Sequence, residues 1–267
     1  MLRTETRNPK TTHIDKMSPL EIARVMNEEN AVAVQAVEAE LPQIAVAMEV
    51  IATALQQGGR LFYVGAGTSG RLGIIDAAEC PPTFGVSRDT VVGLMAGGLD
   101  AMVNASENRE DDPEASVAEL KERNLSGKDV MVGISAAGGA AYVLNAVRYA
   151  KSLGCPTVGI TSNKGSAIDR AADIPICPDT GPEVITGSTR LKAGTAQKLI
   201  LNMLSTGAMI RSGYVYENLM INLKPTNPKL RQRVIRIVSE ITGESMEAAE
   251  ARLEANQWVI QIGRAHV

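Results

Sequence analysis

The sequence predicts an α/β protein built on a five-stranded parallel sheet, and three observations support this fold class. Five short apolar runs alternate with helical or loop segments, as they do in βαβ units. The chain has 267 residues, of which 45% are hydrophobic and 21% charged, which suits one large α/β domain or one domain with a small appendage. Helical patterns precede and follow the apolar runs. We therefore expect a parallel sheet with helices on both faces.

Two helices are predicted before the sheet. The first begins at Ser18-Pro19-Leu20-Glu21, a capping box with proline at the first helical position. The second runs from about Val32, bends at Pro42 and stops at Gly58-Gly59. We assign residues 1–58 to an N-terminal helical segment that packs on the core.

The five apolar runs predict the strands. They are RLFYV, TVVGLM, DVMVGIS, PTVGITS and IPIC, at residues 60–64, 90–95, 129–135, 156–162 and 174–177. The first and third runs each lead into a small-residue loop and a helix start, which predicts two ligand-facing loops at the carboxyl ends of neighbouring strands. Helical patterns return at residues 195–213, 227–243 and 245–262. We assign residues 59–225 to the sheet domain and residues 226–261 to a partial C-terminal helical subdomain.

The last six residues, IGRAHV at 262–267, fit no helical pattern. They match one reading frame of a widely used sequencing adapter. We therefore expect residues 262–267 to be a sequencing artefact and the natural chain to be cut short near Gln261. A disordered natural tail is the alternative.

Composition narrows the possible functions. A formal charge of -3 argues against a general nucleic-acid or membrane-surface binder. Three widely spaced cysteines and an N-terminus without an apolar core predict a cytoplasmic protein. Since His13 and His266 are the only histidines, a zinc site or a histidine base in the central domain is not expected. Carboxylates must therefore carry any proton transfer.

The loop after the first strand contains Gly65-x-Gly67-x-x-Gly70, the spacing of a dinucleotide-binding turn. A Rossmann fold also needs an acidic residue at the end of the second strand, but no carboxylate occurs there before Asp100. Thr68 and Ser69 lie inside the loop, where hydroxyls and helix N–H groups suit a single phosphate. A nucleotide, a sugar or other small phosphate, and a structural turn all stay open at this point.

A second polar loop, GPEVITGSTRLKAGTAQK at residues 181–198, runs directly into an apolar helix. Ser188 or Thr189 alone would be enough to cap that helix. A cap does not account for Arg190 and Lys192, which follow at once.

These two loops, together with AGG at 96–98 and the opening TETRNPKTTHID, resemble the N-acetylmuramic acid 6-phosphate etherases. That family shares a sugar isomerase (SIS) fold and signature with the glucokinase regulatory proteins. The similarity runs from about residue 4 to residue 261. It implies a three-layer α-β-α sandwich of SIS type, with N-terminal helices and a truncated, UBA-like helical appendage at the C-terminus. It also implies a cytoplasmic homodimer with active sites near the subunit boundary, no cofactor or metal, and neither nucleic acid nor membrane as a partner.

The resemblance further implies a lyase of amino sugar catabolism and cell wall recycling. Its substrate is N-acetylmuramic acid 6-phosphate, and its products are N-acetylglucosamine 6-phosphate and D-lactate. In the ring-opened aldehyde a base can remove the acidic C2 proton, the C3 ether oxygen leaves as lactate, and water adds back. This elimination and hydration need one or two acid/base groups and no redox cofactor. The alternative is a non-catalytic phosphosugar-binding regulatory protein. An NAD-dependent oxidoreductase is disfavoured because the second-strand acid is missing.

By the same resemblance, Glu79 and Glu110 are the catalytic pair. From the residues alone, Glu79 is a helix-terminal surface residue and Glu110 belongs to a solvated acidic loop. We expect Glu79 to be partly buried, either about two helical turns beyond the glycine loop or in the break that Pro81-Pro82 would impose, so that a ligand held by Thr68 and Ser69 would lie near it. The implied substrate- and phosphate-binding residues are Gly67, Thr68, Ser69, Ser135, Glu183, Ser188, Thr189 and Lys192.

One loop departs from the family pattern. Etherases usually have Ser-Gly-Arg-Thr-Pro after the third strand, whereas this chain has Ala137-Gly138-Gly139-Ala140-Ala141. Either the remaining hydroxyls of Thr68, Ser69, Ser135 and Ser188 hold the phosphate with backbone N–H groups, or the chain binds this substrate weakly or binds another. We expect the etherase activity to survive, because both glutamates and the loop at 181–198 are retained.

Overall fold

The computed structural model describes residues 2–104, 109–225 and 227–258, and it has the expected α/β architecture. The sheet is parallel throughout, in the order β2-β1-β3-β4-β5. The strands are β1 (Leu61–Gly65), β2 (Val91–Met95), β3 (Val130–Ile134), β4 (Thr157–Ile160) and β5 (Ile174–Ile176). All five predicted strands are therefore confirmed. The strand order reverses between β1 and β3, so the loops after these two strands flank the switch point at which α/β sheets bind ligands.

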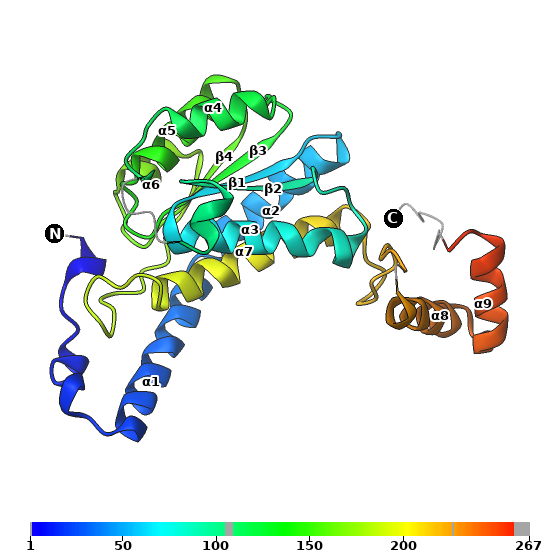
Figure 1. The fold of residues 1–267 in the computed structure, drawn as a ribbon, viewed down its shortest axis with the longest axis horizontal. Coiled ribbons are helices and arrows are strands. Elements are labelled where there is room, and N and C mark those ends of the chain that lie inside the picture. The colour runs from blue at the N-terminus through cyan, green and yellow to red at the C-terminus, as the bar shows by residue number, and fades with distance from the viewer. Residues whose placement is uncertain (1, 105–108, 226, 259–267) are drawn as a thin grey trace.

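Helices cover both faces of the sheet (Figure 1). One layer contains α2 (Leu41–Gln56), α3 (Gly67–Phe84) and α7 (Lys192–Arg211), and the other contains α4 (Ala115–Glu122), α5 (Ala141–Ser152) and α6 (Ala167–Ala171). Along β1, Leu61 and Tyr63 pack into the first layer and Phe62 and Val64 into the second, as the alternation of a strand requires. The predicted three-layer sandwich is confirmed.

The N-terminal helices differ from the prediction in their boundaries. The capping box at Ser18 and Glu21 is present, but α1 (Pro19–Glu38) continues through the expected break before Val32. Since the residues around Val32 include neither glycine nor proline, nothing stops the helix there. Pro42 is what stops it, because its ring would clash with the carbonyl of Glu38, four residues earlier. The next helix, α2, starts at Leu41 and is bent by 61° from α1.

Short 3-10 segments complete the N-terminal region and the loop after β2. They are η1 (Arg3–Glu5), η2 (Pro9–Thr11), η3 (Ile14–Lys16) and η4 (Leu99–Met102). Among the described helices, none alone has the length and apolar character needed to cross a bilayer, although α1 and α2 satisfy both criteria as a bent pair.

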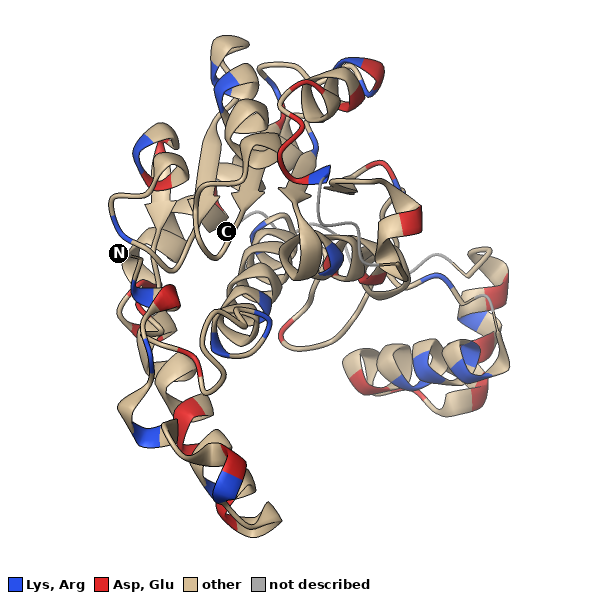
Figure 2. Cartoon of the chain, turned by 60° about the vertical axis from the view of Figure 1, so that its left-hand side comes forward, with Lys and Arg blue, Asp and Glu red and all other residues tan. Residues whose placement is uncertain are grey.

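The C-terminal helices α8 (Pro228–Thr242) and α9 (Met246–Ala255) form a small hydrophobic cluster of their own. They lie at the end of the molecule, away from the sheet (Figure 1). Asn227 caps α8 and Ser245 caps α9. Charges of both signs occur on α1, α8 and α9, so the small net charge reflects mixed surfaces (Figure 2). Gln261 and the expected artefact at 262–267 lie outside the described residues.

Candidate active site

The N-terminus of α3 lies at the carboxyl end of β1 and has the geometry of an anion site. Gly67 begins the helix with φ +53°, a left-handed conformation that glycine adopts without strain. The N-cap residue Ala66 has no side chain that could accept a hydrogen bond from the first turn. The N–H groups of this turn, next to the hydroxyls of Thr68 and Ser69, therefore face a position where an anion would satisfy them.

The start of α7 packs against the start of α3. The buried Ser69 hydroxyl donates to Gln197 Oε1 over 3.0 Å, and Gln197 Nε2 has no partner among the described residues. A Cβ placed on Gly194 would lie 3.4 Å from Thr68 Cγ2 and 3.5 Å from the Thr189 carbonyl oxygen. The two loops singled out in the sequence thus meet at one place. Gln197 was not predicted, because a polar residue on an otherwise apolar helix gives no indication of which way it faces.

Glu183, not Ser188 or Thr189, caps α7. Its carboxylate accepts the N–H groups of Lys192 and Ala193, each over 3.0 Å, and it is fully buried. A carboxylate at this position also interacts favourably with the helix dipole. Ser188 and Thr189 are half-buried in the turn before the helix, so the alternative interpretation of these two residues as the helix cap does not hold.

The predicted binding residue Lys192 is held by Glu29 of α1. Both side chains are buried, and their charged groups are hydrogen-bonded to each other. Glu29 also accepts from Lys10 Nζ over 2.9 Å and from Asn8 Nδ2 over 2.8 Å. Burial alone would raise the pKa of Glu29, but hydrogen bonds from Lys192 and Lys10 lower it to about 2. Lys192 thus has its counter-charge inside the chain, which sequence reasoning missed.

The N-terminal segment lies along the same edge of the sheet. Thr11 Oγ1 donates to the Val184 carbonyl over 2.9 Å, which ties η2 to the loop before α7. Asn163 Nδ2 donates to Thr4 Oγ1 over 3.1 Å and to the Ala136 carbonyl over 3.0 Å. Thr4 is fully buried by these contacts. The segment TETRNPKTT is thus a fixed part of the site's surroundings.

The loop after β3 is closed by its own hydrogen bonds. Buried Ser135 accepts the Gly138 N–H at its Oγ over 3.1 Å. Gly138 has φ +75°, and a Cβ there would lie 2.1 Å from Ser166 Oγ, so only glycine fits. The exposed Glu110 lies beside this loop, because its carbonyl accepts the Tyr142 N–H over 3.0 Å at the start of α5. The structure thus places Glu110 and Ser135 near the same switch point as Thr68 and Ser69.

Glu79 lies elsewhere on α3. It is 12 residues beyond Gly67 in an unbroken helix, or about 18 Å along the helix axis. Pro81 and Pro82 do not break the helix, which continues to Phe84 and ends at a left-handed Gly85. Glu79 is exposed, not partly buried. Ser69 and Glu79 are ten residues apart, or about 15 Å along the helix axis, which is farther than the expected proximity.

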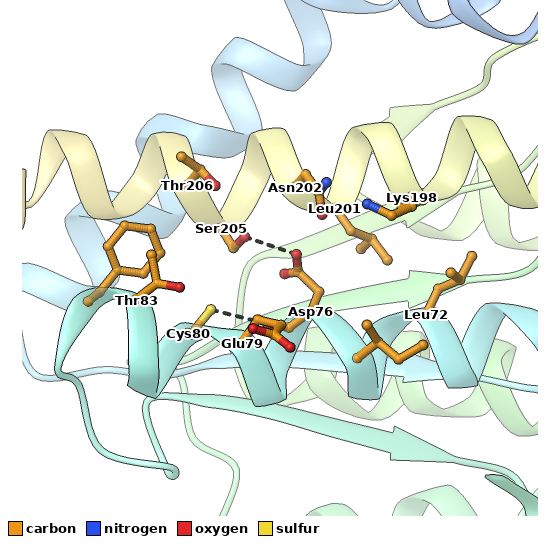
Figure 3. A pocket seen from close by; sticks show the side chains of 12 residues that line it. Leu72, Asp76, Glu79, Cys80, Thr83, Lys198, Leu201, Asn202, Ser205 and Thr206 are labelled. Atoms are coloured by element: carbon orange, nitrogen blue, oxygen red, sulfur yellow. Dashed lines mark hydrogen bonds between the residues drawn. The ribbon is translucent and has the colours of Figure 1, made fainter. Parts of the chain in front are cut away.

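A pocket of about 310 Å³ lies beside Glu79, between α3 and α7 (Figure 3). The residues that line it are Leu72, Ile75, Asp76, Glu79, Cys80, Thr83, Phe84, Lys198, Leu201, Asn202, Ser205 and Thr206. Asp76, at its base, accepts from Tyr63 over 2.9 Å and from Ser205 over 3.2 Å. Burial raises the pKa of Asp76, although these two hydrogen bonds oppose the change. No trio of His, Cys, Asp or Glu among the described residues is arranged to hold a metal ion.

Comparisons with known proteins agree with this architecture. Residues 43–151 match the glucokinase regulatory protein N-terminal SIS domain, and residues 115–207 match the SIS domain. The N-acetylmuramic acid 6-phosphate etherase of Clostridium beijerinckii is 49% identical over 98% of this chain and 86% of its own length. N-acetylmuramic acid 6-phosphate etherase 2 of Vibrio parahaemolyticus is 54% identical over 95% of this chain and 85% of its own length.

Solved structures show the same fold at lower identity. A putative phosphosugar isomerase involved in capsule formation from Bacteroides fragilis is 20% identical, with a TM-score of 0.58 over 75% of this chain and 95% of that one. A phosphoheptose isomerase from Neisseria gonorrhoeae is 20% identical, with a TM-score of 0.56 over 72% of this chain and 98% of that one. At this level of identity the similarity shows a shared fold and nothing more. It confirms the SIS-type sandwich expected from the motifs.

Proposed function

This chain belongs to the N-acetylmuramic acid 6-phosphate etherase family, and we propose that it has the family's activity. It is a lyase that cleaves the D-lactyl ether of N-acetylmuramic acid 6-phosphate, giving N-acetylglucosamine 6-phosphate and D-lactate. The observation that carries this proposal is the high identity to proteins of that name over nearly the whole chain. A regulatory, non-catalytic role is not favoured, because these relatives are named as enzymes.

Two carboxylates divide the proton transfers. In the ring-opened substrate, one takes the C2 proton as an enolate forms, and the other gives a proton to the C3 ether oxygen as the C–O bond breaks. Elimination leaves a C2=C3 double bond conjugated with the C1 aldehyde. Water then adds at C3 and gives its proton to the carboxylate that protonated the leaving oxygen, and the enolate that forms again takes a proton at C2 from the other carboxylate. We assign the C2 proton to Glu110, which lies beside the switch point, and the leaving oxygen to Glu79, which lines a pocket. General acid and base groups contribute about 10²- to 10⁴-fold each.

The phosphate is bound at the start of α3 in this proposal. Thr68 and the first-turn N–H groups supply donors, the Ser69 hydroxyl joins them when it turns from Gln197 Oε1 to the phosphate, and Ser135 closes the site from the neighbouring strand. Glu183 and Lys192 fix the start of α7 and so hold Ser188 and Thr189 over the phosphate. The short side chains at 137–141 leave the anchoring of the phosphate to these groups.

Two copies of the chain build each site. Because Glu79 lies about 18 Å along α3 from Gly67, the Glu79 that serves a substrate held at Ser69 comes from a second copy. A homodimer with its sites at the subunit boundary satisfies this geometry. Exposed apolar side chains on α1 and α2, among them Leu20, Val34 and Val46, provide surface for such an interface.

Incubation of the purified protein with N-acetylmuramic acid 6-phosphate tests the function directly. We expect D-lactate release by the wild type, and at least a 100-fold lower kcat for Glu79→Gln and for Glu110→Gln. Glu122→Gln, an exposed carboxylate on α4, is the matched control and should leave kcat unchanged. In deuterated water the wild type should also incorporate deuterium at C2. A folded wild type that binds the substrate but releases no lactate and exchanges no C2 proton would identify a phosphosugar sensor instead.

A further inference from the structure

The pocket beside Glu79 contains a cation, the ammonium group of Lys198, which takes no part in the proton transfers proposed above. Among the described residues that line it, Lys198 is the one positively charged side chain. Lys198 projects from α7 toward Asn202 and Asp76 (Figure 3). The Asn202 amide, oriented to satisfy both neighbours, accepts from Lys198 Nζ over 2.9 Å and donates to Asp76 Oδ1 over 3.1 Å.

The ammonium group of Lys198 remains available to a ligand. Its side chain is exposed, and no carboxylate among the described residues forms an ion pair with it. By contrast, the buried Lys192 on the same helix is neutralised by Glu29. Asn202 takes one of the three donors of the Lys198 ammonium, so two remain to point into the pocket.

The leaving group of the proposed reaction carries a charge that this cation fits. If Glu79 protonates the ether oxygen, the lactyl carboxylate is only two bonds from that oxygen and must lie close to Glu79. Two carboxylates at short range repel each other unless a cation lies between them or one is protonated. A pocket of about 310 Å³ is roughly ten times the volume of one liquid water, about 30 Å³, and so has room for a three-carbon acid.

Resting on the proposed function, we infer that Lys198 binds the carboxylate of the D-lactyl group and makes the enzyme selective for ethers that bear an acid. Asn202 and Asp76 position its ammonium group over the pocket. Lys198 is thus a specificity-determining residue for the leaving group.

The test compares the natural substrate with an analogue whose lactyl carboxylate is a primary amide of the same size. Formation of N-acetylglucosamine 6-phosphate is measured for both. The wild type should prefer the acid by about 10- to 100-fold in kcat/KM, as expected for a charge-assisted hydrogen bond. Lys198→Met should lose that preference, because its kcat/KM should fall for the acid and not for the amide. Lys198→Arg should keep part of the preference. Lys128→Met, at an exposed lysine before β3, is the matched control and should behave as the wild type.

The ratio of acid to amide turnover distinguishes the possible outcomes. A wild type that turns over acid and amide equally well would overturn the assignment, as would a Lys198→Met enzyme that slows equally on both. If Lys198→Met fails to fold, the ratio of kcat/KM on the acid to kcat/KM on the amide is measured for Lys198→Gln and compared with the same ratio for the wild type. A wild type inactive on both compounds would contradict the proposed function itself. Turnover without discrimination would contradict only the role of Lys198.

Discussion

Glu29 shows how a single carboxylate can organise a site without touching the ligand. It joins α1 to the start of α7 through Lys192, and to the N-terminal segment through Lys10 and Asn8. The sequence offered no reason to select it, because Glu28, Glu29 and Asn30 read as an ordinary polar helix surface. Its role depends on contact with α7, whose Lys192 lies more than 150 residues later in the chain. A contact between residues so far apart leaves no local pattern in the sequence.

Replacing Glu29 with glutamine should destabilise the protein in a pH-dependent way. A pKa lowered from 4.5 to about 2 corresponds to roughly 3 kcal/mol of native-state stabilisation. That stabilisation is present in full above the unfolded pKa near 4.5 and is lost as the pH falls toward 2. Urea unfolding should therefore show a wild-type advantage of about 3 kcal/mol that is constant from pH 7 to pH 5 and shrinks below pH 4.5.

Glu49→Gln provides the comparison for this measurement. Glu49 pairs with Arg211, but both side chains are largely exposed, so the loss should stay below about 1 kcal/mol. A difference between wild type and Glu29→Gln that did not change with pH would mean that the ion pair is not its source.

The strands of the sheet could be predicted from the sequence more accurately than the ends of the helices. The five strands follow from apolar runs bounded by polar or small residues, and their parallel order follows from the helices between them. The boundary of α1 was misplaced because the sequence around Val32 contains no helix-breaking residue, whereas Pro42 acts on a carbonyl four positions earlier. The cap of α7 was also missed, since Glu183 lies nine residues before Lys192.

At Gly70, α3 passes very close to the sheet. A Cβ there would lie 2.5 Å from Met95 Cβ and 2.8 Å from the Gly65 carbonyl oxygen. Gly70→Ala should therefore lower the free energy of unfolding by about 1 to 3 kcal/mol, because neither neighbour is a flexible side-chain end. Thermal unfolding measures the effect.

Gly139→Ala is the control for this substitution. No heavy atom lies within 4 Å of a Cβ at Gly139, and its φ is not in the left-handed range, so its stability should change little. Equal destabilisation by the two variants would contradict close approach as the cause at Gly70, because the change in backbone entropy alone favours the alanine variant.

For the whole molecule, the motifs indicated a set of candidate groups but not their arrangement. Thr68 and Ser69 could be placed in a ligand-facing loop from their position after the first strand, whereas Glu110 reads from the residues alone as part of a solvated acidic loop. The place of Glu79 depended on whether α3 continued past Pro81, and its partner site depends on a second copy that one sequence cannot place. The candidate residues can therefore be listed from the sequence, whereas their division between two copies of the chain is a proposal that rests on the three-dimensional structure.

Mixed dimers test this arrangement. A dimer of one Glu79→Gln chain and one Glu110→Gln chain, purified through two different tags, should contain one intact site and one doubly altered site. We expect about half of the wild-type rate of lactate release, whereas each variant alone is nearly inactive. Light scattering at micromolar concentration should show a dimer for all three proteins. Activity of the mixed dimer no higher than that of its parents would place Glu79 and Glu110 of the same chain in one site.

The length of α3 then acquires a meaning beyond packing. In the proposed dimer, the helix carries the phosphate-binding groups of one site at its first turn and the proton donor of the other site 12 residues later, so its length sets the spacing between them. Deleting one residue between Arg71 and Ala78 would shorten this spacing by about 1.5 Å and turn the far end of the helix by about 100°. Both sites of the dimer would lose their alignment together. Insertions and deletions in this stretch should therefore be far less tolerated than substitutions on its exposed side.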